Sequence, residues 1–226
     1  VEHHVAQLLS AYGASPFDTA VAVSVDGFGD FASSAWGLGR DGRVEADGRV
    51  FFPHSLGLFY QALTQFLGFP HYGDEYKVMG LAPYGEPRFV NTMLQHLVDV
   101  KPDGSLAMDM SYFNYCQGLT MTNDKFASLF GGPARNPESA ITQREMDIAA
   151  SIQRVTEEVV LRMARHAKEL TGSKNLCLAG GVALNCVANG KLLREKIFED
   201  VFVTPASGDA GGALGAALFV HHQLLD

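Results

Sequence analysis

The pattern of apolar and polar positions divides the first part of the chain into strands followed by a helix. Residues 19–25 (TAVAVSV) are β-branched and apolar, which predicts a buried strand ending at a turn rich in Gly and Asp. Asp-Gly pairs at 41–42 and 47–48 predict a meander of short antiparallel strands. Apolar residues at helical spacing then predict a helix over residues 54–69.

The last third of the chain has the order strand, glycine turn, helix, strand, turn. A long helix is predicted over residues 142–171, where apolar residues recur every three or four positions. A buried strand at 176–179, a helix and a second strand at 200–205 follow, and the second strand leads to a turn with Asp209. Such a βαβα arrangement has parallel strands, whose C-terminal ends receive ligands. Asp26, after the first predicted strand, occupies the same kind of position.

The middle of the chain gives weaker patterns. Residues 73–87 (GDEYKVMGLAPYGEP) contain so much Gly and Pro that we expect an ordered loop. A short helix is predicted over 88–98, and residues 101–113 predict a hairpin. The chain begins within a helical pattern, VEHHVAQLLSAYG, without an initiator Met or a capping residue, which indicates a piece of a longer protein.

Composition narrows the class of protein. The chain has 226 residues, of which 47% are hydrophobic, as in a soluble globular protein of one or two domains. Its net charge is −8 and its basic residues are scattered, so nucleic-acid binding is not expected. The three cysteines form no CxxC pair and fit reduced thiols in the cytoplasm. No apolar run reaches the roughly 18 residues of a membrane span.

Four polar residues are candidate metal ligands. His3 and Gln7 are four positions apart and share one face of the predicted helix. Asp26 and Asp209 follow predicted strands, and carboxylates with an imidazole suit Fe²⁺, Mn²⁺ or Mg²⁺. Asp30 is an alternative ligand or a supporting residue. Purely structural roles remain open: a solvated helix end for His3, a turn for Asp26 and a helix cap for Asp209.

Glycine turns mark a candidate nucleotide site. Gly180 and Gly181 open a helix, whose backbone N–H groups attract phosphate, and Asn185 can hydrogen-bond a base or a ribose. Gly57 and Gln61 lie one helical turn apart and could form the other wall. A plain strand-to-helix turn and a close helix contact explain these residues equally well.

Lys77 is the candidate for catalytic contact with phosphate, because it is the one base in a loop otherwise apolar or acidic. A salt bridge to Asp74 or Glu75 is the structural alternative. The sequence contains no GxSxG motif and no Cys/His pairing that would indicate a covalent nucleophile.

Long motifs together resemble the O-carbamoyltransferase family of nodulation-factor and antibiotic biosynthesis. They are, in order, EHHVAQLLSAY, VSVDGFGD, PHSLGLFYQALTQFLGF, GDEYKVMGLAPYG, ITQREMDIAASIQ, LCLAGGVALNCVANGKLL and PASGDAGGALGAAL. The resemblance implies an α/β fold of the actin, sugar-kinase and heat-shock-chaperone ATPase class (ribonuclease H-like), similar to the enzyme that places threonylcarbamoyl on tRNA. It implies a partial two-lobed domain: residues 1–53 in the first lobe, and 54–226 as a helix-rich connection and second lobe.

The family's reaction implies a function for the longer protein. Its members form carbamoyl adenylate from ATP and carbamoyl phosphate in a C-terminal domain, then transfer the carbamoyl group to a small-molecule hydroxyl. Here the opening segment and the adenylate-forming domain would lie outside the sequence, so the fragment alone is expected to be inactive. The alternatives are a phosphotransferase or ATPase of the same superfold, and a non-catalytic nucleotide-binding module.

The resemblance also implies roles for single residues. His3, Asp26 and Asp209 would ligate iron, and Gln7 stands where the family has a second histidine. A neutral amide oxygen is a weaker ligand than an imidazole, so lower iron affinity is expected, with Mg²⁺ or Mn²⁺ as alternatives. The residues expected beside ATP or carbamoyl adenylate are Gly27, Gly57, Gln61, Gly180, Gly181 and Asn185.

Overall fold

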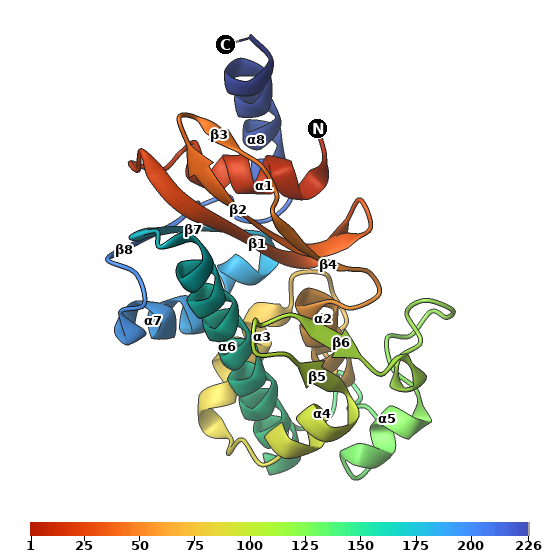
Figure 1. Ribbon diagram of the computed structural model, residues 1–226. Coiled ribbons are helices and arrows are strands. Elements are labelled where there is room, and N and C mark those ends of the chain that lie inside the picture. The colour runs from red at the N-terminus through yellow and green to blue at the C-terminus, as the bar shows by residue number, and fades with distance from the viewer. Residues whose placement is uncertain (226) are drawn as a thin grey trace.

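The protein consists of a mixed β-sheet with helices on both faces. The larger group of helices forms a body against one face. The computed structural model describes residues 1–225 (Figure 1). The sheet strands are β1 (Thr19–Gly29), β2 (Ala32–Arg40), β3 (Arg43–Val44), β4 (Gly48–Phe51), β7 (Asn175–Ala179) and β8 (Asp200–Val203). Their order is β3-β2-β1-β7-β8, and β4 also pairs with β2. The predicted antiparallel meander is therefore present, and it is followed by parallel strands β7 and β8.

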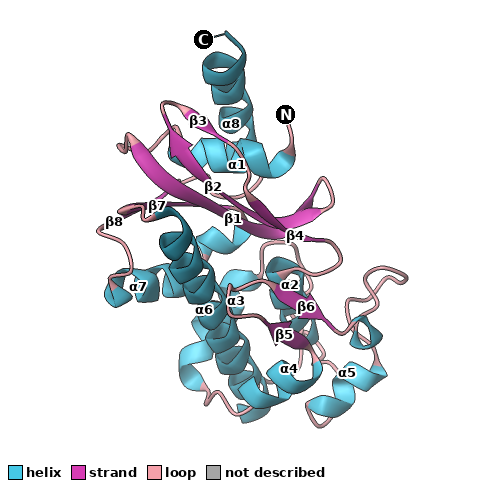
Figure 2. Ribbon diagram, in the orientation of Figure 1, coloured by secondary structure: helices cyan, strands magenta, loops and turns pink. Residues whose placement is uncertain are grey.

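The helices lie on both sides of this sheet. They are α1 (His3–Tyr12), α2 (Leu56–Phe66), α3 (Glu75–Leu81), α4 (Val90–His96), α5 (Asp124–Leu129), α6 (Gln143–Thr171), α7 (Cys186–Glu195) and α8 (Gly211–Phe219). Figure 2 shows α1 and α8 on one side, and α2 to α6 on the other with the small hairpin of β5 (Val98–Val100) and β6 (Leu106–Met108). Within residues 1–225, no helix is both long and apolar enough to cross a bilayer.

The sheet unites segments that are far apart in the sequence. Central strand β1 pairs with β2 on one edge and with β7 on the other, where Val21 lies opposite Leu176. Residues 1–53 and the strands after residue 174 thus share one sheet, and residues 54–174 form the helical body below it. The division into lobes of residues 1–53 and 54–226 stays a prediction, and in the structure strands from both ranges, β1 and β7, pair within one sheet.

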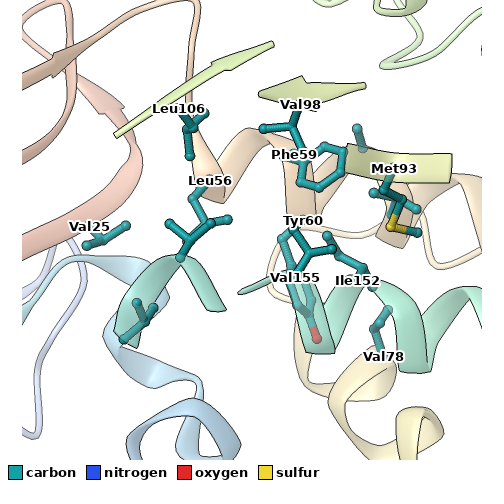
Figure 3. Close-up of a cluster of buried hydrophobic side chains, with 14 of the residues drawn as sticks. Val25, Leu56, Phe59, Tyr60, Val78, Met93, Val98, Leu106, Ile152 and Val155 are labelled. Atoms are coloured by element: carbon teal, nitrogen blue, oxygen red, sulfur yellow. The ribbon is translucent and has the colours of Figure 1, made fainter. Parts of the chain in front are cut away.

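The alternation of side chains along β1 explains the two layers. Val21, Val23 and Val25 point to the helical body, where they join a core that includes the fully buried Phe59 of α2 (Figure 3). On the opposite face, small alanines allow α1 to pack closely against the strand. The alternation of valines with smaller residues along this strand therefore specifies which layer each side chain enters.

The segment 73–87 corrects the sequence-based expectation of a loop. It contains α3, followed by a 3-10 turn over Ala82–Tyr84. Val78 is fully buried against the core, whereas the helix presents Gly80 on an open face where a Cβ would meet nothing within 4 Å. Burial of one apolar side chain outweighs the low helix propensity of glycine, and the proline falls within the following turn.

Helices α1 and α8 touch backbone to backbone. A Cβ added at Gly215 of α8 would lie 1.7 Å from the carbonyl oxygen of Ala6 in α1. No side chain larger than hydrogen fits there without moving one helix. This contact sets the distance between the starts of the two helices, which carry the site residues described below.

We expect Gly215→Ala to lower the free energy of unfolding by about 1–3 kcal/mol, because the added methyl overpacks this contact. Gly212→Ala is the matched control, since a Cβ at Gly212 of the same helix meets nothing within 4 Å. The control should stay within about 0.5 kcal/mol of the parent. Urea unfolding followed by circular dichroism measures both, and equal stabilities for the two variants would contradict the close contact.

Candidate functional site

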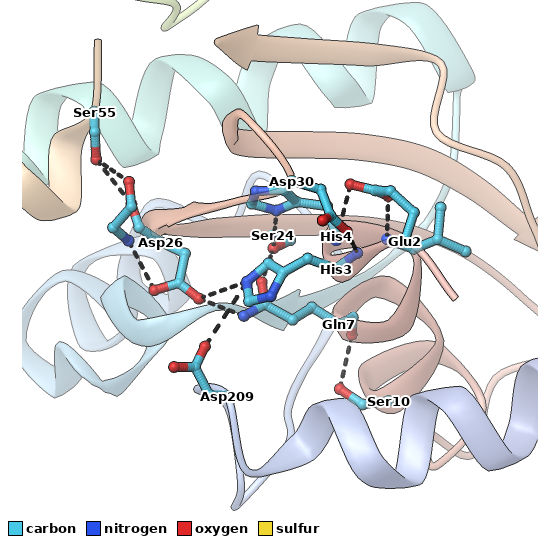
Figure 4. Close-up of polar contacts among 12 residues, drawn as sticks. Glu2, His3, His4, Gln7, Ser10, Ser24, Asp26, Asp30, Ser55 and Asp209 are labelled. Atoms are coloured by element: carbon cyan, nitrogen blue, oxygen red, sulfur yellow. Dashed lines mark hydrogen bonds and ion pairs between the residues drawn. The ribbon is translucent and has the colours of Figure 1, made fainter. Parts of the chain in front are cut away.

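The predicted ligand residues meet where β1 and β7 end. Asp26 lies in β1 immediately after Val25, at the point where the regular pairing with β2 is interrupted. Asp209 lies in the turn that precedes α8, and His3 is the first residue of α1. Figure 4 shows the three side chains pointing toward one another from these separate elements.

His3, Asp26 and Asp209 have the geometry of a candidate cation site. His3 Nε2 lies 3.4 Å from Asp26 Oδ2 and 3.8 Å from Asp209 Oδ1. One ligand atom from each residue falls within 4.8 Å of the other two. Asp209 is exposed, whereas Asp26 and His3 are partly buried. An imidazole nitrogen and two carboxylates fit a divalent cation that prefers oxygen ligands.

Hydrogen bonding keeps the central carboxylate charged. Burial opposes the charge on Asp26, but hydrogen bonds from His3, Gln7 and the backbone N–H groups of Gly27 and Gly181 together hold its pKa below the usual range. The hydrogen bond to Asp26 in turn raises the pKa of His3, against the opposing effect of burial. Without a cation, the hydrogen bond between His3 and Asp26 therefore favours the charged form of both side chains.

Gln7 occupies the place expected for a fourth ligand but presents its amide nitrogen to the cluster. Gln7 Nε2 donates to Asp26 Oδ2, and Gln7 Oε1 accepts a hydrogen bond from the Ser24 hydroxyl. Asp30, the alternative to Asp26, instead accepts a 2.8 Å hydrogen bond from the backbone N–H of His3. Glu2 caps the same helix start, although the sequence showed no capping residue there.

The polar residues behind Gln7 were not found from the sequence. Fully buried His4 lies on the opposite side of Ser24 from Gln7, with Nδ1 2.9 Å from Ser24 Oγ. Burial lowers the pKa of His4, so its ring is neutral at pH 7. The available signal was Ser24 itself, the one serine within the apolar run of β1.

A cavity of about 420 Å³ opens beside the cluster, and Asp26 belongs to its wall. The lining residues that the sequence had selected are Gly27, Gly57, Gln61, Gly181 and Asn185. The remaining lining residues are Tyr60, Tyr72, Gly73, Glu75, Tyr76, Met79, Val182 and Leu184. Among its aromatic residues, Tyr76 was missed because the segment from 73 to 87 was expected to be a loop, whereas nothing in the sequence marked Tyr60 and Tyr72.

The predicted glycines differ in what they do. A Cβ at Gly57 would lie 2.5 Å from the carbonyl oxygen of Asp26, so Gly57 permits a close contact between α2 and β1. Gly180 has a φ of 85° and lies outside the cavity lining, with its N–H donating to Ser207 O at 2.7 Å. Gly27 is different, because the nearest atom to an added Cβ is 4.0 Å away. It leaves open space on the cavity side.

Asn185 is largely engaged within the protein. Its Oδ1 accepts from the backbone N–H of Ala188, which caps α7, and from Gln153 Nε2. Its Nδ2 donates to Gln153 Oε1, which also accepts from the Tyr60 hydroxyl. The hydrogen-bonded amides of Asn185 and Gln153 thus link α6, α7 and α2 along one wall of the cavity. Asn185 stabilises this wall and keeps one N–H that a ligand can accept.

Lys77 forms the salt bridge that was its structural alternative. Its Nζ lies 2.7 Å from Asp74 Oδ1. Lys77 is not among the residues that line the cavity. By contrast, Tyr72, Tyr76 and Leu184 line it and remain well exposed, at 89%, 61% and 56%. The cavity mouth is therefore apolar and aromatic rather than basic.

Comparison with known proteins places the chain in a family. It belongs to the carbamoyltransferase N-terminus family, whose sequence profile matches residues 1–218. Uncharacterized protein sll1178 of Synechocystis is 56% identical over 99% of the chain, which spans 36% of that protein. Nodulation proteins NolNO of Sinorhizobium fredii and NolO of Bradyrhizobium diazoefficiens are both 39% identical over 99% of the chain. The chain spans 31% and 39% of their lengths.

Solved structures share the fold at low sequence identity. HypF of T. kodakarensis matches the whole chain with a TM-score of 0.51 and 16% identity, and the chain spans 37% of it. A full-length HypF in the phosphate- and nucleotide-bound form gives a TM-score of 0.50 at 14% identity, and the chain spans 43% of it. These matches support the mixed α/β fold.

The His3–Asp26 pair predicts a pH dependence of stability in the presence of a chelator. The raised pKa of His3 contributes stability that is fully present below its unfolded value of about 6.5 and is lost as the pH rises through the higher folded value. His3→Gln removes this contribution. The difference in unfolding free energy between parent and variant should therefore shrink from pH 6 upward, as measured by urea unfolding. A difference that is constant with pH would contradict the pairing.

Proposed function

We propose that the chain supplies the transfer domain of a longer O-carbamoyltransferase. In this reaction, carbamoyl adenylate made from ATP and carbamoyl phosphate gives its carbamoyl group to a hydroxyl of a natural product or sugar. The observation that carries the proposal is the double role of Asp26, which belongs both to the cation cluster and to the wall of the adjoining cavity. A ligand in the cavity would have its polar end beside the cluster.

The cavity suits an adenylate. Its volume of about 420 Å³ is within the range of small-molecule sites. The exposed rings of Tyr72 and Tyr76 and the side chain of Leu184 offer apolar faces against which a base can pack. Gly27 and Gly181 place backbone rather than side chains next to Asp26, which leaves room for a phosphate to approach. The base would therefore lie at the mouth and the phosphate at the cluster.

We further propose that His3, Asp26 and Asp209 hold one divalent cation, Fe²⁺, Mn²⁺ or Mg²⁺. The donor set fits, because the three ligand atoms lie within 4.8 Å of one another and Asp26 is kept ionised. When bound, such a cation stabilises negative charge on a phosphate.

The reaction that we propose for this site is acyl transfer. The acceptor oxygen attacks the carbamoyl carbon, the bond from that carbon to the phosphate oxygen breaks, and AMP leaves with the bonding electrons while the hydroxyl proton is released. The residues of this chain hold the donor in one orientation and exclude water from its apolar end. Formation of the adenylate is assigned to the rest of the longer protein, in the cytoplasm, where ATP is available. The sheet would be part of an actin-like, ribonuclease H-like domain.

We expect Gly27→Val to weaken binding of ATP or of a stable carbamoyl-adenylate analogue at least tenfold in the full-length protein. The side chain would enter the cavity, yet Gly27 has space for a Cβ, so the free energy of unfolding should change little. Gly80→Ala, on an open face of α3, is the control. Isothermal titration calorimetry measures the affinities.

Unchanged affinity in Gly27→Val would place the nucleotide elsewhere and contradict the proposal. The reaction class is tested separately by mixing the full-length protein with ATP, with and without carbamoyl phosphate. Carbamoyl-dependent formation of AMP supports the transferase, whereas ATP turnover without carbamoyl phosphate supports a phosphotransferase or ATPase.

A further inference from the structure

A buried chain of hydrogen bonds runs from the cation cluster into the protein (Figure 4). Gln7 Nε2 donates to Asp26, the Ser24 hydroxyl donates to Gln7 Oε1, and His4 Nδ1 lies 2.9 Å from Ser24 Oγ. Gln7, Ser24 and His4 are each fully buried. Buried polar groups of this kind are costly unless they are paired, so the direction of each hydrogen bond is constrained by its neighbours.

The contact between Gln7 and Asp26 sets that direction. Gln7 presents its amide nitrogen to Asp26 and donates a hydrogen bond to Oδ2 of that carboxylate. The amide oxygen then faces Ser24, whose single hydroxyl hydrogen is donated to it. Ser24 can only accept from its other neighbour, and His4 must therefore carry its hydrogen on Nδ1.

We propose that Gln7 positions Asp26 and is not a cation ligand, and that Ser24 and His4 hold its amide in the required orientation. The proposal rests on the cation site proposed above. The amide nitrogen has no lone pair available for a cation, and the amide oxygen is engaged by Ser24. The hydrogen bond from Gln7 orients the ligating carboxylate, as outer residues commonly do around metals.

This arrangement has a consequence for which cation is selected. His3, Asp26 and Asp209 provide one nitrogen and two carboxylate ligands, and no second imidazole. The remaining coordination positions are open to water or to phosphate oxygens of the donor. Oxygen-rich sets of this kind favour Mg²⁺ or Mn²⁺ over softer ions.

The competing arrangement makes Gln7 a ligand through its oxygen. The amide would then have to turn and donate to Ser24, Ser24 would donate to His4 Nδ1, and His4 would carry its hydrogen on Nε2. The Ala32 backbone is the group to which that hydrogen would be donated, but in the structure it forms no hydrogen bond of ordinary geometry with His4 Nε2. The two arrangements therefore differ in the tautomer of one buried histidine, which can be observed directly.

The first experiment is ¹⁵N NMR of histidine-labelled full-length protein, before and after addition of Mg²⁺, with His4→Gln used to assign the signal. We expect the Nδ1–H tautomer of His4 in both states. An Nε2–H tautomer in the metal-free protein, or a change to it when Mg²⁺ binds, would overturn the proposal. Absence of any Mg²⁺ binding would count against the cation site alone, because the metal-free tautomer still decides the orientation of Gln7.

The second experiment measures Mn²⁺ affinity by electron paramagnetic resonance in Ser24→Ala. Loss of the hydroxyl frees the Gln7 amide to turn, so we expect Mn²⁺ to bind about tenfold more weakly. An Mn²⁺ affinity in Ser24→Ala equal to that of the parent would show that Ser24 does not hold the Gln7 amide in place for the site, and that result would overturn the proposal. Ser10→Ala is the matched control, because this fully buried serine donates to the backbone carbonyl of Gln7 and not to its amide. Its affinity should equal that of the parent.

Discussion

The site depends on the hydrogen bonds that one partly buried carboxylate, that of Asp26, accepts near the end of the central strand. Asp26 is kept ionised by donors from separate segments: His3 and Gln7 of α1, its neighbour Gly27, and Gly181 after β7. A charge taken out of water is destabilising unless such partners surround it. Correct pairing of β1 with β7 and docking of α1 are therefore conditions for a stable Asp26, and the same contacts bring the candidate ligands together.

Much of this arrangement could be inferred from the sequence, since short-range patterns and strand ends carry the information. A run of β-branched and apolar residues predicted β1, and Asp-Gly turns predicted the meander after it. The position of acids after predicted strands indicated that Asp26 and Asp209 meet at one edge of the sheet. Sequence spacing placed Gln7 on the right helix face, but could not say which amide atom faces Asp26. That choice depends on Ser24 and His4, which are contacts made in space. Helix α3 was missed for a similar reason, because burial of Val78 depends on the assembled core.

The cavity is formed by both layers of the fold. Asp26 and Gly27 come from the sheet, Gly181 and Leu184 from the turn after β7, and the opposite wall from α2 and α3 of the helical body. The close approach of α2 to β1, permitted by Gly57, therefore sets the width of the cavity at its base. Gly57 can therefore control how a ligand fits through the packing of the two walls, in addition to lining the cavity itself.

The positions of the ligands in the sequence have a thermodynamic consequence. Residues 3 and 209 lie almost at the two ends of the described chain, and Gly215 lets their helices meet backbone to backbone. A cation held by both would act as a reversible cross-link between two segments about 200 residues apart in the sequence. An unfolded chain does not keep these ligands together, because closing so long a loop costs conformational entropy. The cation would therefore bind the folded state and raise the free energy of unfolding. The proposed cation site would then also stabilise the tertiary structure.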